Sequence, residues 1–299
     1  MKAGFVSLVG RPNAGKSTLL NRFAGQKLAI VSDKPQTTRH RITGVRNVPA
    51  GQIVFIDTPG IHKPMHRMNR RMVDAATGTL REVDVAVLVV DVSEPQGAGD
   101  RFVLDLVKNS RVSCVLALNK VDQVRKPKLL PIIQTYAAVM PFRAIVPVSA
   151  LTGDGVETLE HEILLALPEG DALFPDDYLT DQTERTLAAE LVREKVLHHT
   201  HEELPYSTGV LIDQFEEPDR PGGLTRIYAS ILVDHDSQKP IVIGKGGEMI
   251  KRIGSEARKD LEELLGGKVF LDLHVKVRQE WRDDERILDE MGMGRRKRS

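Results

Sequence analysis

The sequence has little of what several classes of protein require. Its 299 residues include a single cysteine, which excludes a disulfide framework and every cysteine-rich zinc module. No apolar run approaches the roughly 20 residues that a membrane-spanning helix needs. The first residues open directly into a strand pattern rather than a signal peptide. These absences favour a soluble intracellular protein, and we expect it in the cytoplasm.

The first 168 residues alternate two kinds of hydrophobic pattern. Continuous runs of Val, Ile and Leu, which suit strands buried on both faces of a sheet, occur at 4–9, 53–56, 83–90, 112–118 and 144–148. Helical patterns fall between them, at 17–23, 68–80, 100–108, 128–139 and 156–167. Because such alternation is typical of βαβ units, we predict that residues 1–168 form an α/β domain. Its sheet should be mostly parallel, with helices on both faces.

The hydrophobic pattern of the sequence changes after residue 168. Residues 169–180 contain proline and several acidic residues without periodicity, which indicates a linker. A small α+β domain is indicated beyond it by a long helix at 182–203, strands at 208–216 and 224–233, helices near the glycines at 244–247 and 254, and a strand at 269–278. We predict that this domain spans 181–280. A C-terminal tail, 281–299, would follow and end in the basic run 295–298.

A phosphate-binding motif follows the first predicted strand. Residues 10–17 match G-x-x-x-x-G-K-[ST] and open a helix, which is the context that gives this pattern its meaning. Backbone N–H groups of such a loop cradle the phosphates of a nucleotide, helped by the helix dipole. We expect Lys16 to bridge the β- and γ-phosphates and the Ser17 hydroxyl to ligate Mg²⁺.

Three further segments follow predicted strands and specify the nucleotide. Asp57 of Asp-Thr-Pro-Gly stands where a metal-binding aspartate must sit, and Gly60 can approach the γ-phosphate. In Asn-Lys-Val-Asp, the Asp122 carboxylate can accept guanine N1–H and N2, which selects GTP over ATP. Ser149 and Ala150 can offer a backbone N–H to guanine O6. The residues that we assign to GTP binding are Gly10, Arg11, Pro12, Asn13, Ala14, Gly15, Lys16, Ser17, Asp57, Thr58, Pro59, Gly60, Ile61, Asn119, Lys120, Val121, Asp122, Ser149 and Ala150.

These motifs resemble those of small GTPases of the translation-factor-like class. The resemblance places the metal-binding threonine of the first switch in 36–40, where we favour Thr38 and keep Thr37 as an alternative. Ile61 replaces the glutamine that orients water in Ras-like enzymes, which suggests slow basal hydrolysis. Asn13 resembles the asparagine that helps to bind potassium in several such families. The expected ligands are GTP or GDP and Mg²⁺, with K⁺ as a further candidate. The metal ligands are predicted to be Ser17, Thr38 and Asp57, and the catalytic residues Lys16, Thr38, Gly60 and Asn13.

The second domain contains the G-x-x-G loop of a KH module. Residues 244–247 lie between an apolar run and a helix, and glycines there let phosphates of a single strand approach the main chain. Six basic and two acidic residues fall within 239–259, a local charge of +4. The order of elements resembles the type II KH fold. The predicted RNA-binding residues are Gly244, Lys245, Gly246, Gly247, Lys251, Arg252 and Arg258.

A GTPase domain followed directly by a type II KH domain resembles the Era family of bacterial ribosome-assembly GTPases. The quoted motifs and a closing segment at 275–288 carry that resemblance over nearly the whole chain. It implies binding to the 3′ region of 16S ribosomal RNA and assistance to 30S subunit assembly by a GTP-controlled switch, in a monomer that can associate peripherally with the inner membrane. Two alternatives stay open. One is a constitutive RNA chaperone with a structural nucleotide; the other, less favoured because a second GTPase domain or a C-terminal catalytic cysteine is missing, is a GTPase of tRNA modification or large-subunit assembly.

The net charge of zero argues, on its face, against a polyanion as partner. Residues 1–179 carry 22 basic and 18 acidic residues, whereas residues 180–299 carry 20 and 24. The half assigned to RNA is therefore the acidic half, with its basic residues gathered near the G-x-x-G loop. We expect RNA to be confined to one face and its binding to show a modest salt dependence.

Overall fold

The computed structural model describes residues 1–34, 37–60, 66–200, 204–218, 220 and 223–293. The chain divides into two compact units, one made mainly of residues 1–181 and the other mainly of residues 182–299. The predicted Ile61 and the basic run 295–298 lie outside the described residues. No helix in the described ranges is long and apolar enough to cross a membrane.

The first unit is built on a six-stranded sheet in the order β2-β3-β1-β4-β5-β6. Its strands are β1 (Lys2–Gly10), β2 (Ile42–Val48), β3 (Gly51–Asp57), β4 (Val85–Asp91), β5 (Ser113–Asn119) and β6 (Ala144–Pro147). All neighbouring pairs are parallel except β2 with β3, which is antiparallel. The predicted mostly parallel sheet is confirmed, and the edge strand β2 is an addition to it.

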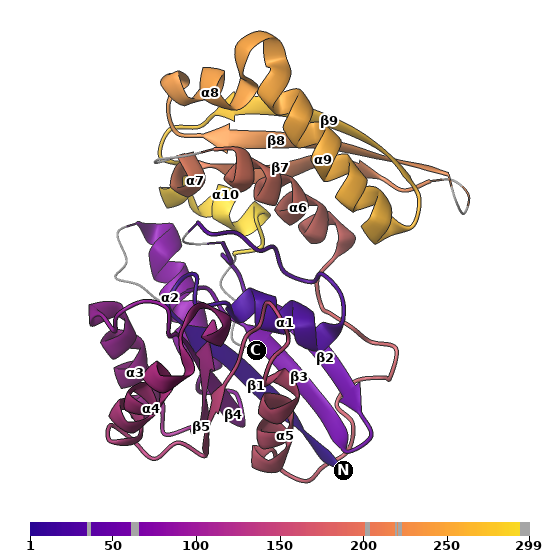
Figure 1. Cartoon of the computed structure of the whole chain (residues 1–299). Coiled ribbons are helices and arrows are strands. Elements are labelled where there is room, and N and C mark those ends of the chain that lie inside the picture. Colours follow the sequence, from indigo (N-terminus) through magenta and orange to yellow (C-terminus); the bar gives the residue numbers. More distant parts are fainter. Residues whose placement is uncertain (35–36, 61–65, 201–203, 219, 221–222, 294–299) are drawn as a thin grey trace. The chain divides into compact units, whose positions relative to one another are not determined.

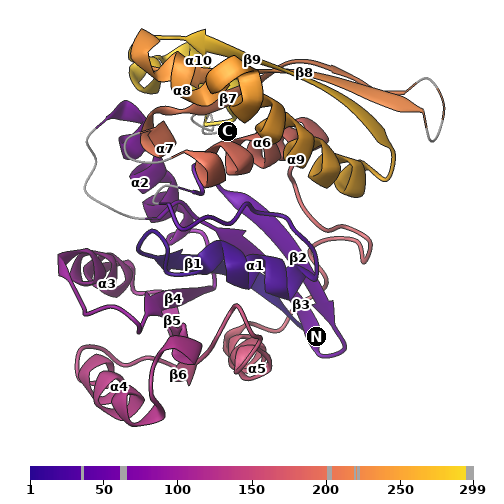
Figure 2. The same cartoon turned by 45° about the horizontal axis from the view of Figure 1, so that its top comes forward.

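Helices cover both faces of this sheet, as predicted (Figure 1). They are α1 (Lys16–Ala24), α2 (Arg67–Thr79), α3 (Ala98–Ser110), α4 (Leu129–Ala137) and α5 (Val156–Ala166). One hydrophobic cluster joins α1 and α5 to one face, and a second joins α2, α3 and α4 to the other (Figure 2). Phe23 of α1 stacks on Phe55 of β3 with ring centroids 4.3 Å apart. Continuous Val, Ile and Leu runs form the strands because side chains on both faces of the sheet are buried.

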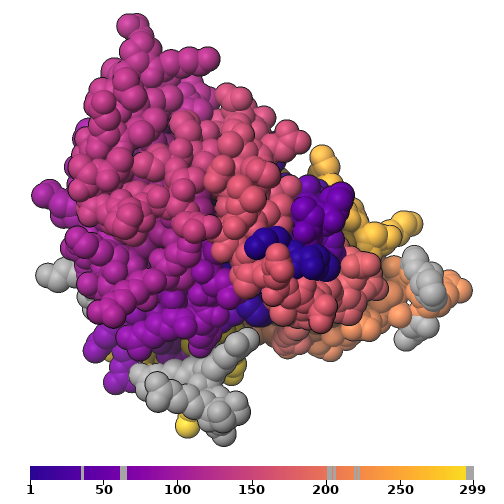
Figure 3. All heavy atoms as spheres, turned by 90° about the horizontal axis from the view of Figure 1, so that it is seen from below, coloured from indigo at the N-terminus to yellow at the C-terminus, as the bar shows by residue number. Residues whose placement is uncertain are grey.

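The predicted linker is held against the first unit. Val45 N–H donates to the carbonyl of Leu179 (2.9 Å), so the segment runs beside the edge strand β2. The buried Gln52 side chain accepts the N–H groups of Leu173 and Phe174 at 2.7 and 2.9 Å. At the other end, Gly170 N–H donates to the carbonyl of Met1 (2.9 Å), and the N-terminus (indigo) lies against the salmon spheres of this segment in Figure 3. These residues act as a strap on the sheet edge rather than as a free connection.

The second unit has a three-stranded sheet in the order β7-β8-β9. Its strands are β7 (Gly209–Glu216), β8 (Leu224–Val233) and β9 (Lys268–Val277), with β7 and β8 antiparallel and β8 and β9 parallel. Its helices are α6 (Glu184–His199), α7 (Leu204–Ser207), α8 (Lys239–Ile243), α9 (Glu248–Leu265) and α10 (Glu285–Glu290). Apolar residues of α6, α8 and α9 form one core with the sheet.

Three details of the second unit differ from the sequence pattern. The helix expected over 182–203 ends at His199, and the first of the two helices expected near the glycines lies before them, at 239–243. The expected tail begins with packed structure. Trp281 is fully buried and its indole N–H donates to the carbonyl of Ser207 (2.8 Å), and Leu288 of α10 is buried as well. The Trp281 side chain is therefore part of the core.

Candidate functional site

The predicted nucleotide motifs meet at the carboxyl edge of the first sheet. The phosphate-binding loop follows β1, residues 57–60 end β3, residues 119–122 end β5, and residues 149–150 follow β6. Strand β1 lies between β3 and β4, so β2 and β3 are on one side of it and β4, β5 and β6 on the other. The phosphate-binding loop follows β1 and therefore lies where the strand order reverses. Open α/β sheets bind ligands at this kind of position.

The loop at residues 10–15 has the backbone shape that a phosphate cradle requires. Asn13 and Gly15 both have positive φ angles, 62° and 95°. A side chain at position 15 would lie 2.1 Å from the Asn119 Nδ2 atom, so only glycine fits there. The Lys16 ammonium is buried and donates to the carbonyls of Gly10 (3.2 Å) and Arg11 (2.8 Å). Burial lowers the pKa of Lys16 to about 8, against the opposing effect of Asp57.

The three predicted metal ligands converge in one cluster. Ser17 Oγ lies 2.7 Å from Thr38 Oγ1 and donates to Asp57 Oδ2 at 2.6 Å. The Thr38 hydroxyl also donates to Asp57 Oδ2, at 3.3 Å. That Thr38 rather than Thr37 binds the metal stays a prediction. Burial raises the pKa of Asp57, although Lys16 and the two hydroxyls oppose that shift.

The cluster fits a magnesium ion. The second carboxylate oxygen of Asp57, Oδ1, is buried and has no hydrogen-bond partner. A buried, unpaired carboxylate oxygen is costly unless a cation or a polar ligand satisfies it. Mg²⁺ prefers oxygen ligands and takes few of them from the protein, so two hydroxyls and one carboxylate are a suitable set.

The Asp-Thr-Pro-Gly segment is tied closely to the phosphate-binding loop. The Thr58 hydroxyl donates to the carbonyl of Leu8 in β1 (2.8 Å). A Cβ at Gly60 would lie 2.7 Å from both the backbone N and Cα of Pro12, which is shorter than real contacts allow. Glycine at position 60 therefore lets the segment that follows β3 touch the loop that follows β1.

Asn119 joins the phosphate side of the site to the predicted base side. Its Nδ2 donates to the carbonyl of Ala14 (2.7 Å), and its Oδ1 accepts the N–H of Ala150 (2.9 Å). A guanine O6 at this loop would share the Ala150 donor with Asn119 or bind a neighbouring N–H. Asp122 is exposed at the start of a short 3₁₀ turn, Val121–Gln123, where its carboxylate is accessible to a base.

Acidic residues that the motifs do not include hold two of the nucleotide loops. Asp91, at the end of β4, binds Lys120 with 2.5 Å between Oδ2 and Nζ. Asp100 of α3 binds the Arg11 guanidinium at 2.8 Å, which raises the pKa of Arg11. Sequence reasoning missed both carboxylates because neither belongs to a motif. The available signal for Asp91 was its place directly after the apolar run 83–90.

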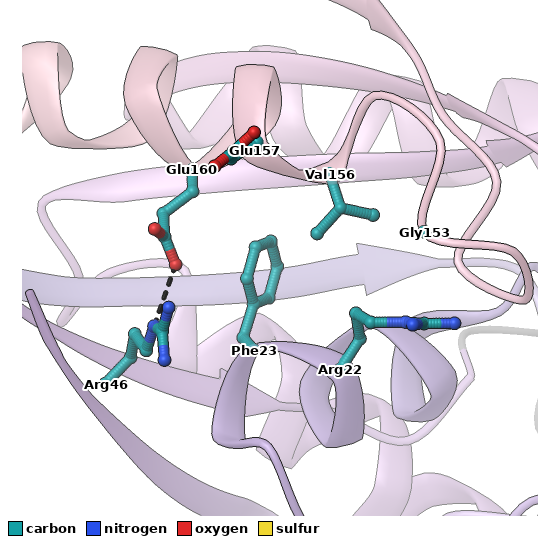
Figure 4. A pocket seen from close by; sticks show the side chains of 7 residues that line it. All are labelled: Arg22, Phe23, Arg46, Gly153, Val156, Glu157 and Glu160. Atoms are coloured by element: carbon teal, nitrogen blue, oxygen red, sulfur yellow. Dashed lines mark hydrogen bonds and ion pairs between the residues drawn. The ribbon is translucent and has the colours of Figure 1, made fainter.

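A pocket of about 250 Å³ lies beneath the loop that follows β6 (Figure 4). The pocket is lined by Arg22, Phe23, Arg46, Gly153, Val156, Glu157 and Glu160. Figure 4 shows Phe23 between two arginines that point in different directions. Arg46 binds Glu160 of α5 at 2.9 Å, whereas Arg22 extends toward the loop at Gly153.

In the second unit, the G-x-x-G loop connects α8 to α9. Gly244, Gly246 and Gly247 all have positive φ angles of 76°, 61° and 82°. Nothing lies within 4 Å of a Cβ built on either of the last two, so the main chain is open to a ligand there. The side chains of Lys245 in this loop and of Lys251, Arg252 and Arg258 in α9 are exposed. Arg252 is ion-paired with Glu256 at 3.2 Å, an interaction that the sequence pattern did not identify.

The fold and the nucleotide-site geometry define the first unit as a P-loop GTPase domain. Family models agree: residues 5–120 match a model described as "50S ribosome-binding GTPase", and residues 203–282 match a KH domain model. The chain is 51% identical to the GTPase Era of Geobacter metallireducens over 291 residues, which is 97% of each chain. It is 45% identical to the GTPase Era of Heliobacterium modesticaldum, over 98% of this chain and 97% of the relative.

Solved structures give the same result for the whole chain. A variant of Aquifex aeolicus Era bound to GDP and AlF4⁻ matches with a TM-score of 0.94 at 40% identity, covering 98% of this chain and 100% of that one. An Era complex with MgGDPNP and nucleotides 1506–1542 of 16S ribosomal RNA matches equally well, at 40% identity over 98% and 99% of the two chains. The chain belongs to the Era family of GTPases, and it is a GTPase.

Proposed function

We propose that the protein is a GTP-controlled switch that binds the 3′ region of 16S ribosomal RNA and assists 30S subunit assembly. In this proposal, residues 1–168 bind and hydrolyse GTP, and residues 181–280 bind RNA through the loop at 244–247. One observation carries the proposal: the same chain holds two sites. The first is a hydroxyl-and-carboxylate cluster suited to Mg²⁺ beside a phosphate cradle, and the second is an exposed G-x-x-G loop followed by a helix with exposed basic side chains. The solved Era complex, which holds both a GTP analogue and 16S RNA, supports it.

The proposed chemistry assigns each residue of the cluster one task. Mg²⁺, held by Ser17, Thr38 and Asp57, would neutralise charge on the β- and γ-phosphates. Lys16 would leave the carbonyls of Gly10 and Arg11 and bind the phosphate oxygens instead. Because Thr38 belongs to the segment before β2, its bond to the metal would couple the γ-phosphate to the position of that segment.

The switch proposal differs from the constitutive alternative in one measurable quantity, which is the affinity for RNA in the two nucleotide states. We expect an RNA with the 3′ sequence of 16S RNA to bind more tightly to the protein loaded with GDPNP than to the protein loaded with GDP. Lys251→Ala should weaken binding in both states. Lys268→Ala, a matched change of an exposed lysine outside the strip 239–259, should leave it unchanged. Equal affinities in the two states would favour the constitutive RNA chaperone.

We also propose that Asn13 helps to hold a potassium ion beside the phosphates. The positive φ angle of Asn13 places it at the bend of the phosphate-binding loop. Hydrolysis should then be faster in potassium chloride than in sodium chloride at equal ionic strength, and Asn13→Ala should remove the difference. A hydrolysis rate that does not change between the two salts would exclude the potassium ion while leaving the GTPase assignment intact.

The proposed setting follows the family resemblance. We propose a cytoplasmic monomer with slow basal hydrolysis and peripheral association with the inner membrane. Light scattering of the purified protein tests the monomer. Sedimentation with vesicles made from inner-membrane lipids tests the association, and a protein that stays in the supernatant would contradict it.

A further inference from the structure

The pocket beneath the loop after β6 contains an arginine that the nucleotide motifs do not include. Arg22 lies in the last turn of α1, the helix that begins at the phosphate-binding loop. Its Nε donates to the carbonyl of Ala150 at 3.2 Å, and its Nη2 donates to the carbonyl of Leu151. One guanidinium thus binds two successive carbonyls of the loop assigned to the guanine base.

These bonds fix the direction of backbone N–H groups. In a planar trans peptide the C=O and the following N–H point in opposite directions. A guanidinium that holds the Ala150 carbonyl therefore directs the Leu151 N–H away from Arg22. The N–H of the next peptide, that of Thr152, already donates to Ser149 Oγ at 3.1 Å. Because the Ala150 carbonyl is bound to a cation, the N–H of the same peptide, that of Leu151, becomes a stronger donor.

The rest of the loop is built to accept this restraint. Ser149 N–H donates to the Asp154 carbonyl and Gly153 N–H to the Ser149 carbonyl, both at 2.8 Å, which closes a tight turn. Gly153 has a φ angle of 96°, and a Cβ there would lie 3.3 Å from the Arg22 Nη1 atom. The turn therefore presents its carbonyls and a side-chain-free position to Arg22.

We propose that Arg22 is a positioning residue for guanine recognition: by holding the carbonyls of Ala150 and Leu151, it aims the Leu151 N–H at the 6-oxo group of the base. The inference rests on the proposed base-binding role of the loop that begins with residues 149–150. It also links the two ends of the nucleotide, since α1 carries the phosphate-binding loop at its start and Arg22 at its end.

The test compares GDP with the 2-aminopurine riboside diphosphate. GDP carries the 6-oxo group; the analogue lacks this group and the N1–H that accompanies it, and keeps the 2-amino group. We expect Arg22→Ala to weaken GDP binding by about tenfold, the size of one charge-assisted hydrogen bond, and to change binding of the analogue much less. Titration calorimetry of the full chain with Mg²⁺ measures both dissociation constants.

Two variants of the same pocket act as controls. Arg22→Lys keeps one cationic donor within reach and should recover part of the lost GDP affinity, and it also serves if Arg22→Ala does not fold. Arg46→Ala removes the other arginine of the pocket, which binds Glu160, and should leave the ratio of the two affinities unchanged.

The outcomes separate the inference from the proposed base site. If the wild-type protein binds both diphosphates equally well, the base site itself is wrong, and the inference falls with it. If the wild-type protein discriminates and Arg22→Ala weakens both nucleotides by the same factor, or neither, then Arg22 has only a structural role and the inference alone is overturned.

Discussion

At the scale of single residues, the one cysteine is buried in the first unit, so its reactivity can be used to follow the unfolding of that unit. Cys114 lies in the interior strand β5, between β4 and β6, and is 2% exposed. Burial raises the pKa of the thiol from 9.0 to about 12. Since only the thiolate is a good nucleophile, a buried thiol of this kind is chemically inert in the native protein.

We predict that Cys114 reacts with an aromatic disulfide reagent only when the first unit unfolds. The raised pKa also gives the pH dependence of stability its sign. The native thiol keeps its proton while the unfolded thiol loses it above pH 9, so this contribution is present below pH 9 and is lost as the pH rises toward 12. The free energy of unfolding should fall there by up to about 1.4 kcal/mol per pH unit from this group. Cys114→Ala should remove that part of the slope; rapid labelling of the native protein at pH 8 would contradict the assignment.

A second residue-scale prediction concerns Gly60. Gly60→Ala would place a methyl group 2.7 Å from the Pro12 backbone, so the segment after β3 and the phosphate-binding loop must move apart. We expect the rate of GTP hydrolysis to fall on the order of 100-fold, because catalytic groups displaced by about 1 Å lose that much. GDP affinity should change less, since Gly60 is assigned to the γ-phosphate.

Gly78→Ala is the matched control for this change. Gly78 lies inside α2, and nothing lies within 4 Å of a Cβ built there. Alanine is the better helix former, so this variant should hydrolyse GTP normally and be more stable by about 0.5–1 kcal/mol. A Gly60→Ala protein with the hydrolysis rate of the Gly78→Ala protein would show that the close approach to Pro12 is unimportant.

The sequence identifies the residues of a motif but not the residues that hold the motif in place. Lys16, Ser17 and Asp57 are recognisable because the chemistry of phosphate and metal demands those residue types at a fixed spacing. Asp91, Asp100 and Arg22 act through ion pairs and hydrogen bonds between segments distant in sequence. Such partners are set by tertiary packing, and no local sequence pattern predicts them.

At the scale of elements, the strands predicted from continuous apolar runs are present in the structure. Strand β2 is also present, but the sequence pattern did not predict it. Strand β2 contains Gly44, Arg46 and Asn47, so it lacks the apolar run of a strand buried on both faces. It forms because β3 supplies a complete antiparallel partner, and because the strap at 169–181 covers its other side. Edge strands are often polar for this reason, and their pairing is decided by neighbours far along the chain.

The attachment of this strap yields an element-scale prediction. Asp181 accepts hydrogen bonds from the Thr43 N–H (3.1 Å) and from the Thr43 hydroxyl (2.9 Å). Thr43 is buried, so removing the carboxylate leaves two donors without this partner. Asp181→Ala should lower the free energy of unfolding by about 1–3 kcal/mol. It should also speed proteolysis within 169–181.

Asp177→Ala provides the comparison, because Asp177 is an exposed carboxylate in the same strap. We expect this variant to unfold at the denaturant concentration of the wild-type protein and to keep its proteolytic resistance. If Asp181→Ala also behaved in this way, the contacts of the strap with β2, Gln52 and Met1 would be enough to hold it without the Asp181 carboxylate.

At the scale of the whole molecule, a net charge of zero conceals an uneven distribution. The second half of the chain is acidic, yet Lys245 in the open glycine loop and Lys251 and Arg258 in α9 are exposed. Acidic residues of the same unit are partly used in ion pairs, such as Lys195 with Asp260 and Arg252 with Glu256. Repulsion from the acidic half should therefore restrict RNA to the strip at 239–259 without preventing binding there.

This distribution predicts the size and the origin of the salt dependence. The strip has a net charge of +4, so if four phosphates are neutralised the logarithm of the RNA association constant should fall with the logarithm of salt concentration with a slope of about −3. Lys251→Ala should make the slope less steep by about 0.7, the value for one contact to a single strand. Arg252→Ala should change it less, because Glu256 already neutralises part of that charge.

Filter binding or fluorescence anisotropy over a series of potassium chloride concentrations measures these slopes, with Lys268→Ala as the variant that should not alter them. A slope near −10 would contradict this prediction, because RNA would then have to contact many more basic residues than the strip contains. A slope that Lys251→Ala leaves unchanged would contradict it as well, because Lys251 would then make no contact with a phosphate.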